Sequence, residues 1–344
     1  MSSEVTSHTG DDVHDTSLNL RNHAFGYETL KNNSAGGYNH AFGYHSMYSN
    51  TLGYYNSAFG ARTLYSNTTG DFNSAFGSRS LYSNTTGSQN TGYGNNSLNS
   101  NTTGNNNTAV GYLALYSNTT ANQNVALGTK ALYSNTTGYS NFGLGVNALS
   151  SNTTASNNTA VGTDALRYNT TGFSNVAIGT QALQNNTEGV YNTAVGHLSM
   201  DGNTTGTWNT AIGYRSLTTN TTGYQNTATG DNSLRYNLSG SYNSASGFSS
   251  LVSNTTGMRN AGFGNTVLYS NTSGSYNTAL GNQALFYNET GSNNVAIGHM
   301  AGYNETRSNM LYISNSATQN LIFGNFDSGD IQLGKISTGL VTTN

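Results

Sequence analysis

Histidines and carboxylates are the residues best suited to acid–base or metal chemistry. In this sequence their spacing matches neither a metal site nor an acid–base pair. The chain has seven histidines without a metal-binding spacing such as HExxH. His23 and His40 occupy equivalent places in a repeated segment. Asp164, Glu188 and Asp231 fall at unrelated places in that segment and form no acid–base pair. With no cysteine as a thiolate ligand, the sequence predicts no enzyme, no metal site and no cofactor.

Aromatic residues recur with a regular spacing that suits surface contact. One interpretation is a column of rings that stabilises stacked strands. The other is a set of platforms for a host-surface glycan or protein, since Tyr and Trp combine apolar area with a polar group. The candidate contact residues are Tyr116, Tyr133, Trp208, Tyr242 and Tyr276.

Asparagines followed by Xaa-Thr recur with the same spacing and match the acceptor sequence for N-glycosylation. In a secretory setting these residues would carry a row of glycans. The alternative is that Asn and Thr supply the turn chemistry of the repeat. The candidate acceptors are Asn67, Asn84, Asn118 and Asn135.

Composition excludes several classes of function for this 344-residue chain. Only 7% of residues are charged and the net charge is −3, so nucleic-acid binding is not expected. No apolar run approaches the roughly 18–20 residues that would cross a bilayer, so no membrane insertion is expected. The amino terminus lacks a basic segment followed by an apolar one, so no signal peptide is visible.

The chain is organised as a tandem repeat in which every 17th position is equivalent. Asparagine occurs at each such position from Asn22 to Asn294, which gives sixteen full repeats over 22–293 without an insertion. We number the repeat positions 1 to 17 from this asparagine. The consensus is N-x-A-φ-G-x-x-s-L-x-x-N-T-T-G-x-x, where φ is apolar and s is small. Position 5 is always Gly and position 9 is always Leu or Met.

A period of this length is too short for a helical repeat and suits one coil of a β-solenoid. We predict an all-β fold with a strand near positions 1–5, a second short strand near positions 8–11 and a corner at N-T-T-G. Stacked coils, ~4.8 Å apart, place like side chains on like and favour hydrogen-bonded ladders of uncharged residues. The predicted turn and ladder residues are Asn107, Gly111, Asn118, Asn124, Gly128, Asn135, Gly162 and Gly179.

Positions 3 and 4 are neighbours on the predicted strand, so their side chains point to opposite faces. In one arrangement Ala at position 3 and Leu at position 9 lie inside, and position 4 forms an outward apolar stripe. In the other, position 4 faces inward and the small residue at position 3 lets another backbone approach. A second chain would cover the open face in both cases, and we predict a homotrimer. The core and interface residues are Val110, Leu115, Leu127, Leu132, Ile178 and Ile212.

The strings NVAIG, NTAVG and NTAIG, over 175–179, 107–111 and 209–213, resemble the repeats of YadA-like trimeric autotransporter adhesin heads. That resemblance implies a trimeric, left-handed parallel β-roll. The longer 17-residue coil, rich in Asn and Thr, resembles repeats of phage and large-virus tail-fibre-like proteins. Residues 309–336 resemble the short β region that precedes an intramolecular chaperone in such fibres. From this resemblance we expect either that a chaperone is cleaved off or that this protein has none.

Three segments follow from these patterns: an amino-terminal cap or attachment arm over 1–21, the solenoid of about sixteen coils over 22–298, and a β cap over 299–344. The expected function is a structural fibre or spike on the virion surface, or otherwise outside the cell. Its expected partners are its own copies, other virion or fibre components, and a host-surface glycan or protein. The alternative is a cell-surface or secreted adhesin or filament. A minor alternative is an ice-binding solenoid, because Thr at positions 13 and 14 forms outward ladders, although Leu52, Glu188, Leu238 and Glu289 interrupt the regular array that ice binding needs.

Overall fold

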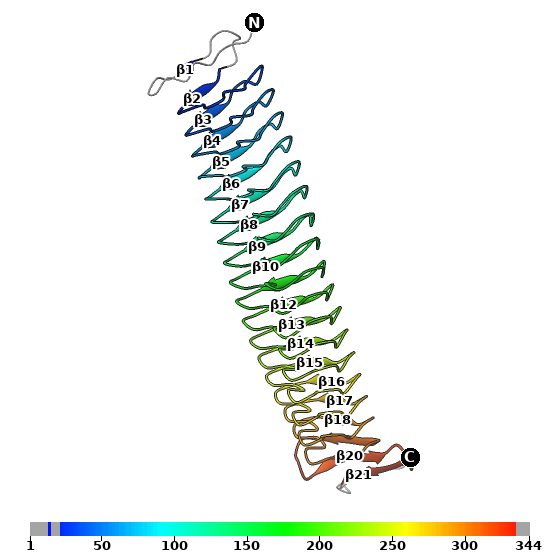
Figure 1. Ribbon diagram of the computed structural model, residues 1–344. Helices are drawn as coiled ribbons and strands as arrows, with labels where there is room; N and C mark the ends of the chain where they lie inside the picture. Colours follow the sequence, from blue (N-terminus) through cyan, green and yellow to red (C-terminus); the bar gives the residue numbers. More distant parts are fainter. Residues whose placement is uncertain (1–12, 15–20, 335–344) are drawn as a thin grey trace, which may run out of the picture. The chain divides into compact units, whose positions relative to one another are not determined.

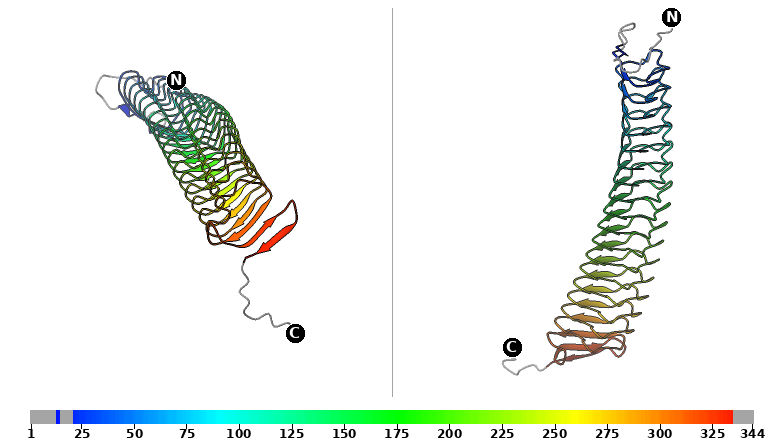
Figure 2. Two further views of the ribbon diagram at one scale, coloured as in Figure 1. Left: turned by 90° about the horizontal axis from the view of Figure 1, so that it is seen from below. Right: turned by 60° about the vertical axis from the view of Figure 1, so that its left-hand side comes forward.

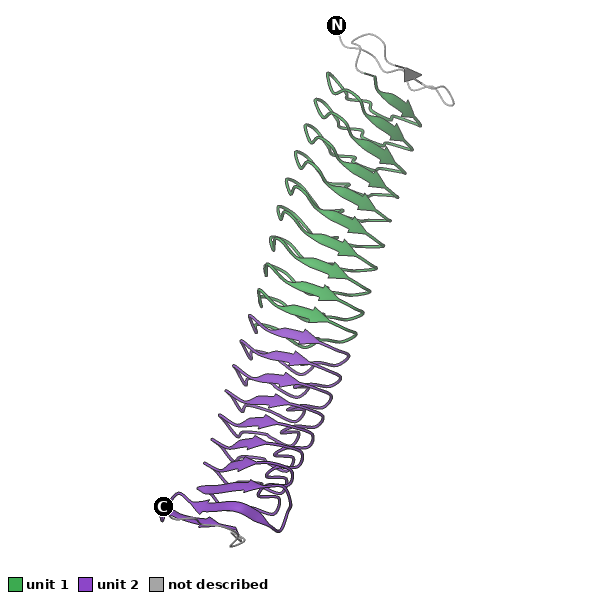
Figure 3. Cartoon of the chain, turned by 180° about the vertical axis from the view of Figure 1, so that it is seen from behind, with its two compact units in different colours: residues 1–188 green, residues 189–344 purple. Residues whose placement is uncertain are grey.

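The computed structural model describes residues 13–14 and 21–334, and it confirms the predicted all-β solenoid (Figure 1). The described residues contain no helix, and they form about 17 turns with a 17-residue repeat. The chain divides into two compact units, residues 1–188 and 189–344 (Figure 3). Within each unit the coils lie one above the next (Figure 2).

Each coil contributes one strand of three residues, at repeat positions 2–4. The strands of unit 1 are β1 (Val13–His14), β2 (His23–Phe25), β3 (His40–Phe42), β4 (Ser57–Phe59), β5 (Ser74–Phe76), β6 (Thr91–Tyr93), β7 (Thr108–Val110), β8 (Val125–Leu127), β9 (Phe142–Leu144), β10 (Thr159–Val161) and β11 (Val176–Ile178). β1 pairs antiparallel with β2. From β2 to β11, neighbouring strands are parallel and offset by one repeat, so that Ala109 lies opposite Ala126.

Unit 2 repeats the same arrangement and ends in a different one. Its strands are β12 (Thr193–Val195), β13 (Thr210–Ile212), β14 (Thr227–Thr229), β15 (Ser244–Ser246), β16 (Ala261–Phe263), β17 (Thr278–Leu280), β18 (Val295–Ile297), β19 (Met310–Ser314), β20 (Asn320–Asn325) and β21 (Asp330–Leu333). β12 to β19 are parallel. β20 then pairs antiparallel with β19, and β21 pairs antiparallel with β20.

The strand alternates between the inside and the outside of the coil. In β7 the middle residue, Ala109, is fully buried, whereas Thr108 is half-buried and Val110 is exposed. Backbone hydrogen bonds tie each strand to the next coil, from Thr108 N to Asn124 O at 2.8 Å and from Gly128 N to Val110 O at 2.8 Å. Of the two predicted arrangements, the one with Ala inside and position 4 outside is observed, and the inward placement of position 4 is wrong.

The second predicted strand, at positions 8–11, is also wrong, because this part of the coil is a turn. Lys130 at position 7 and Leu132 at position 9 both have left-handed backbone conformations, with φ of 57° and 51°. These conformations interrupt an extended chain. The turn still bonds to the next coil, from Leu132 N to Ala148 O at 2.9 Å, and it aims the Leu132 side chain into the core, where that residue is fully buried.

Two asparagine columns share the interior with the Leu and Ala columns. At position 12, Asn135 Nδ2 donates to Asn118 Oδ1 at 3.0 Å and to the carbonyl of Gly138 at 2.9 Å. At position 1, the backbone N–H of Asn124 donates to Asn107 Oδ1 at 3.0 Å. Since these asparagines are fully buried, their amides must satisfy one another. The predicted ladders are therefore hydrogen-bonded inside the coil.

Glycine at position 5 is required by both its conformation and its surroundings. Gly111 has a φ of 137°, a region that side chains disfavour, and Gly128, Gly162 and Gly179 have φ of 139°, 133° and 132°. A Cβ added to Gly111 would lie 2.6 Å from the carbonyl oxygen of Gly128 in the next coil. No other residue fits where the coils approach so closely.

The repeat ends at β19, where one residue is missing from the coil, and Val295 pairs with Leu311. Strands β19–β21 lie over 310–333, within the segment 299–344 for which a β cap was predicted. Residues 335–344 of that segment lie outside the described residues. The same holds for the predicted amino-terminal arm, except for residues 13–14 and Arg21.

Candidate functional site

In each unit, the side chains at repeat position 4 form an outward column of mostly apolar residues, which we call the position-4 stripe. Val110, Ile178 and Ile212 are 41%, 41% and 42% exposed, and Leu127 is half-buried. In unit 1 the stripe comprises Phe25, Phe42, Phe59, Phe76, Tyr93, Val110, Leu127, Leu144, Val161 and Ile178. In unit 2 it comprises Val195, Ile212, Phe263, Leu280 and Ile297, with Thr229 and Ser246 between them. Leu115 and Leu132, predicted together with these residues as core or interface residues, lie fully buried in the core.

The aromatic part of the stripe is stacked along the coils. The rings of Phe42 and Phe59 lie 4.8 Å apart and 6° from parallel, and those of Phe59 and Phe76 lie 4.8 Å apart and 5° from parallel. Neighbouring rings cover each other's faces and leave their edges outward. The stripe is therefore ordered before any partner binds, which lowers the entropic cost of association.

The predicted contact aromatics fall into two groups with different surroundings. Tyr116 and Tyr133 are half-buried and stacked on each other, with ring centroids 5.4 Å apart. Trp208, Tyr242 and Tyr276 are more open, with exposed fractions of 56%, 40% and 51%. The open group is therefore the better placed for contact with another molecule.

Arg259 lies between two of these open aromatics and was not among the predicted residues. Its guanidinium carbon is 5.1 Å from the ring centroid of Tyr242 and 5.4 Å from that of Tyr276, and its Nη1 donates to Tyr276 Oη at 2.5 Å. Such cation–π contacts hold the guanidinium in place. The sequence did contain the signal, because Arg259 occupies position 17 between Tyr242 and Tyr276 in the same column.

The four predicted glycan acceptors are inside the coil. Asn67, Asn84, Asn118 and Asn135 are fully buried, and each Nδ2 donates to the asparagine of the preceding coil. A glycan attached to these nitrogens would replace a donor and would have no space within the folded coil. Their spacing reflects the internal ladder, so the glycosylation hypothesis does not agree with this fold.

Threonines at position 13 use their hydroxyls within the chain. Thr119 Oγ1 donates to the carbonyl of Thr136 at 3.1 Å, and Thr136 Oγ1 donates to the carbonyl of Thr153 at 3.1 Å. Only the position-14 threonines, such as Thr137, are exposed. The two-column Thr surface considered for ice binding is thereby reduced to one open column.

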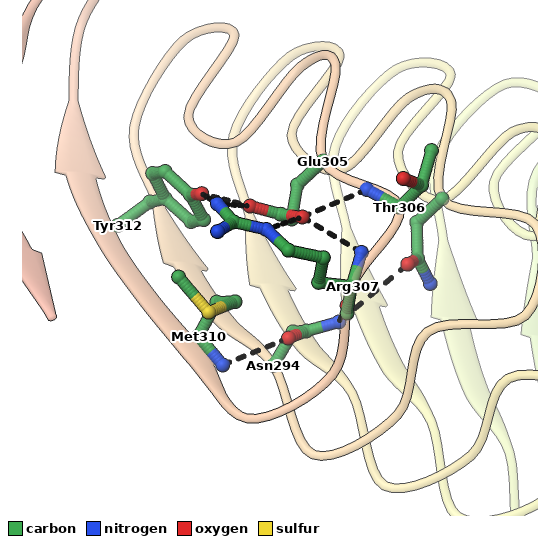
Figure 4. A network of polar contacts seen from close by, with 7 residues as sticks. Asn294, Glu305, Thr306, Arg307, Met310 and Tyr312 are labelled. Atoms are coloured by element: carbon green, nitrogen blue, oxygen red, sulfur yellow. Dashed lines mark hydrogen bonds and ion pairs between the residues drawn. The ribbon is translucent and has the colours of Figure 1, made fainter. Parts of the chain in front are cut away.

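A buried polar network closes the end of unit 2, and sequence reasoning missed it (Figure 4). Glu305 occupies position 12, where each full repeat has Asn. Its carboxylate accepts hydrogen bonds from Arg307 Nε at 3.0 Å, from Arg307 Nη2 at 2.9 Å and from the Tyr312 hydroxyl. Glu305 is 6% exposed. The departure from Asn at this position was the available signal.

The electrostatics of this network favour an ionised carboxylate. Burial raises the pKa of Glu305, but the hydrogen bonds from Arg307 and Tyr312 outweigh that effect and lower the pKa from 4.5 to about 2. Burial and the neighbouring carboxylate raise the pKa of the Tyr312 phenol well above its usual range. The Glu305 carboxylate and the Arg307 cation neutralise each other, so the network closes the structure and offers no reactive group.

Tyr312 also fills the apolar core where the Leu column ends. Position 9 of the last coil is Gly302. A Cβ placed there would lie 2.9 Å from Cδ2 of Tyr312 and 3.0 Å from Cδ2 of Leu285. The ring of Tyr312 thus takes the volume that a leucine fills in the other coils.

The described residues, 13–14 and 21–334, contain no group of three or more His, Cys, Asp or Glu that could hold a metal ion. Within the same ranges there is no helix long and apolar enough to cross a membrane. No protein-family model matches the chain, and comparison with curated proteins finds none that is similar to it. The interaction surfaces therefore have to be interpreted from their own chemistry.

Proposed function

We propose that this protein is a structural fibre or spike component of a virion, similar to a phage tail fibre, and that it works as a homotrimer. The position-4 stripe is the observation that carries this proposal. Partners would be two further copies of the chain, other virion or fibre components, and a glycan or protein on the host surface. The resemblance of the repeats to YadA-like heads and to tail-fibre-like proteins supports the same assignment.

The stripe supports self-association because it is long, regular and apolar. Fully burying a Val, Leu or Ile side chain is worth roughly 1.5–3 kcal/mol. Val110, Ile178 and Ile212 keep about 40% of their surface exposed, so covering each would contribute about 1 kcal/mol. A column of such residues exceeds the apolar patches that monomers usually expose. A second copy of the chain carries the same stripe with the same coil spacing. Its apolar side chains therefore match those of the first copy in number and in spacing.

Host contact is assigned to the open aromatics of unit 2. Trp208, Tyr242 and Tyr276 present apolar ring area beside polar atoms, as surfaces that bind sugars or proteins often do. Arg259 adds a fixed cation between two of these rings. A cell-surface or secreted adhesin would use the same two surfaces, so imaging of the native particle distinguishes the two assignments.

The test is the mass of the full chain in solution, measured by light scattering. We expect three times the 36.2 kDa of one chain. The double variant Val110→Lys with Leu127→Lys places two charges in the stripe and should shift the species to a monomer. Thr120→Lys with Thr137→Lys, at exposed position 14 of the same two coils, is the matched control and should leave the trimer unchanged. Circular dichroism establishes that each variant is folded. A folded wild-type monomer at all concentrations would refute the proposal.

A further inference from the structure

Three tyrosines at repeat position 10 form a stacked row in unit 1. The ring centroids of Tyr48 and Tyr65 are 5.2 Å apart with the planes 10° from parallel. Those of Tyr65 and Tyr82 are 5.1 Å apart and 9° from parallel. All three residues are half-buried, so their ring edges reach solvent. Because they occupy one position on parallel coils in register, their phenol groups point in the same direction.

Other tyrosine pairs in unit 1 have the same geometry. Tyr116 and Tyr133 are 5.4 Å apart at 10°, also at position 10. Tyr38 and Tyr55, at position 17, are 4.8 Å apart at 11°. Stacking between coils therefore brings pairs of tyrosine rings face to face at several places, and the members of each pair are one repeat apart in the chain.

We propose that these rows are sites of oxidative tyrosine coupling, which joins neighbouring coils through dityrosine. Each of two phenols loses one electron and one proton to give two phenoxyl radicals. A carbon–carbon bond forms between their ortho carbons, and each ring loses that ortho hydrogen as its phenol is restored. The net loss is two protons and two electrons. Hydrogen peroxide, acting through a haem peroxidase, takes these up and is reduced to two molecules of water.

The fold favours this reaction because it holds the two reacting groups together. Well-oriented groups in one molecule can reach effective concentrations of about 10⁵ M or more, far above any concentration of free tyrosine side chains. To form the bond, the two rings have to turn from face-to-face stacking so that their ortho carbons meet edge to edge, and side chains that reach solvent can make that movement. A radical formed on Tyr65 has a partner on each side.

Coupling would supply a covalent link that the chain otherwise lacks. The sequence has no cysteine and therefore no disulfide. Each dityrosine would close a loop of one coil and restrict the unfolded chain, as a disulfide does. A fibre exposed to harsh surroundings would gain resistance to unfolding. This inference does not depend on the proposed trimer, since each pair belongs to one chain.

Exposed tyrosines without a stacked tyrosine serve as internal controls. Tyr112 and Tyr139 are both 52% exposed. Their equivalents in the coils on either side are not aromatic, being Asn and Thr for Tyr112 and Asn and Ser for Tyr139. Any oxidant that reaches the rows also reaches these two residues, but the fold gives them no tyrosine partner in the adjacent coils.

The test uses dilute, folded full-length protein treated with a haem peroxidase and hydrogen peroxide. Trypsin cleaves after Arg62, Arg79 and Lys130, and so separates the members of the two position-10 rows. We expect mass spectrometry to find the separated peptides joined, with a mass lower by two hydrogen atoms for each link. Links within the rows should exceed links of Tyr112 or Tyr139 by at least about tenfold.

Two variants sharpen the outcome. Tyr65→Phe should remove both links of its row and leave the Tyr116–Tyr133 link intact, whereas Tyr139→Phe should change neither. Oxidation in denaturant should abolish the preference for the rows. The proposal is overturned if row peptides separate fully after oxidation, or if links form equally at Tyr112 and Tyr139.

Discussion

Replacement of one buried asparagine by aspartate tests the internal ladder most directly. Asn135 Nδ2 donates to Asn118 Oδ1 at 3.0 Å and to the carbonyl of Gly138 at 2.9 Å. Its Oδ1 accepts a hydrogen bond from Asn152 Nδ2 at 2.8 Å. Asn135→Asp keeps the shape and the acceptor but removes both donors. The oxygens of Asn118 and Gly138 then face a carboxylate in a fully buried site.

The expected cost follows from these lost bonds. Asn118 Oδ1 is left without a donor, which costs about 1–3 kcal/mol, whereas the carbonyl of Gly138 keeps the hydrogen bond that Asn124 Nδ2 donates to it at 2.8 Å. The desolvated charge adds to this cost at pH 7. We therefore expect Asn135→Asp to lower the free energy of unfolding by about 2 kcal/mol or more at pH 7. Urea titration followed by circular dichroism measures this difference.

The pH dependence gives the prediction a second readout. Burial raises the pKa of the introduced carboxyl in the folded chain above its unfolded value of ~3.9. The protonated form regains one donor, so the variant should be closest to the wild type below that pH and should fall behind it as the pH rises. Asn122→Asp, the same change at an exposed position, is the control. If the two variants lie within about 1 kcal/mol of each other at pH 7, the ladder does not stabilise the coil as described.

Three further changes have distinct expected outcomes. Gly128→Ala should lower the free energy of unfolding by at least about 2 kcal/mol, whereas Lys130→Gly, at an exposed left-handed position, should change it by no more than about 1 kcal/mol; thermal unfolding compares them. In the wild type, stabilisation by ionised Glu305 is complete above pH 4.5 and is lost as the pH falls toward about 2. Glu305→Gln should remove that acid sensitivity and cost up to about 3 kcal/mol at neutral pH, as read from hydrogen exchange of the amides over 305–312. Secretion from a eukaryotic cell should leave Asn118 without a glycan, and a glycopeptide modified at Asn118 in mass spectrometry would contradict its burial.

The repeat made much of the fold predictable. Because every coil has the same length, Asn124 must meet Asn107 and Asn141 once the coils stack in register. That condition is sufficient to predict the solenoid and the ladders, whereas the close contact between coils at the position-5 glycine is seen only in the structure. The period does not reveal backbone handedness within the coil. The left-handed conformation of Leu132 is an uncommon one for that residue type, and this explains why a second strand was predicted where the structure has a turn.

The candidate surfaces were less predictable, because a column of like residues has the same sequence pattern inside or outside the coil. Asn118 and Tyr116 both recur with the period of the repeat, but the first is buried in a ladder and the second lies half-buried in a ring stack. An Asn-Xaa-Thr string therefore had two interpretations, and only the direction of the side chain decides between them.

The sequence by itself determined the coil length, the contents of each column and the scarcity of charge, since residues one repeat apart become neighbours in any in-register stack. Only the tertiary structure decided which columns face the interior and which face solvent, as the column of Val110 does. It also decided how the last coil ends. Glu305 and Tyr312 belong to no shared column, yet the phenol donates to the carboxylate. They meet because Tyr312, on β19, takes the inward place opposite Ala296, from which its phenol reaches a buried carboxylate that no repeated asparagine supplies with donors.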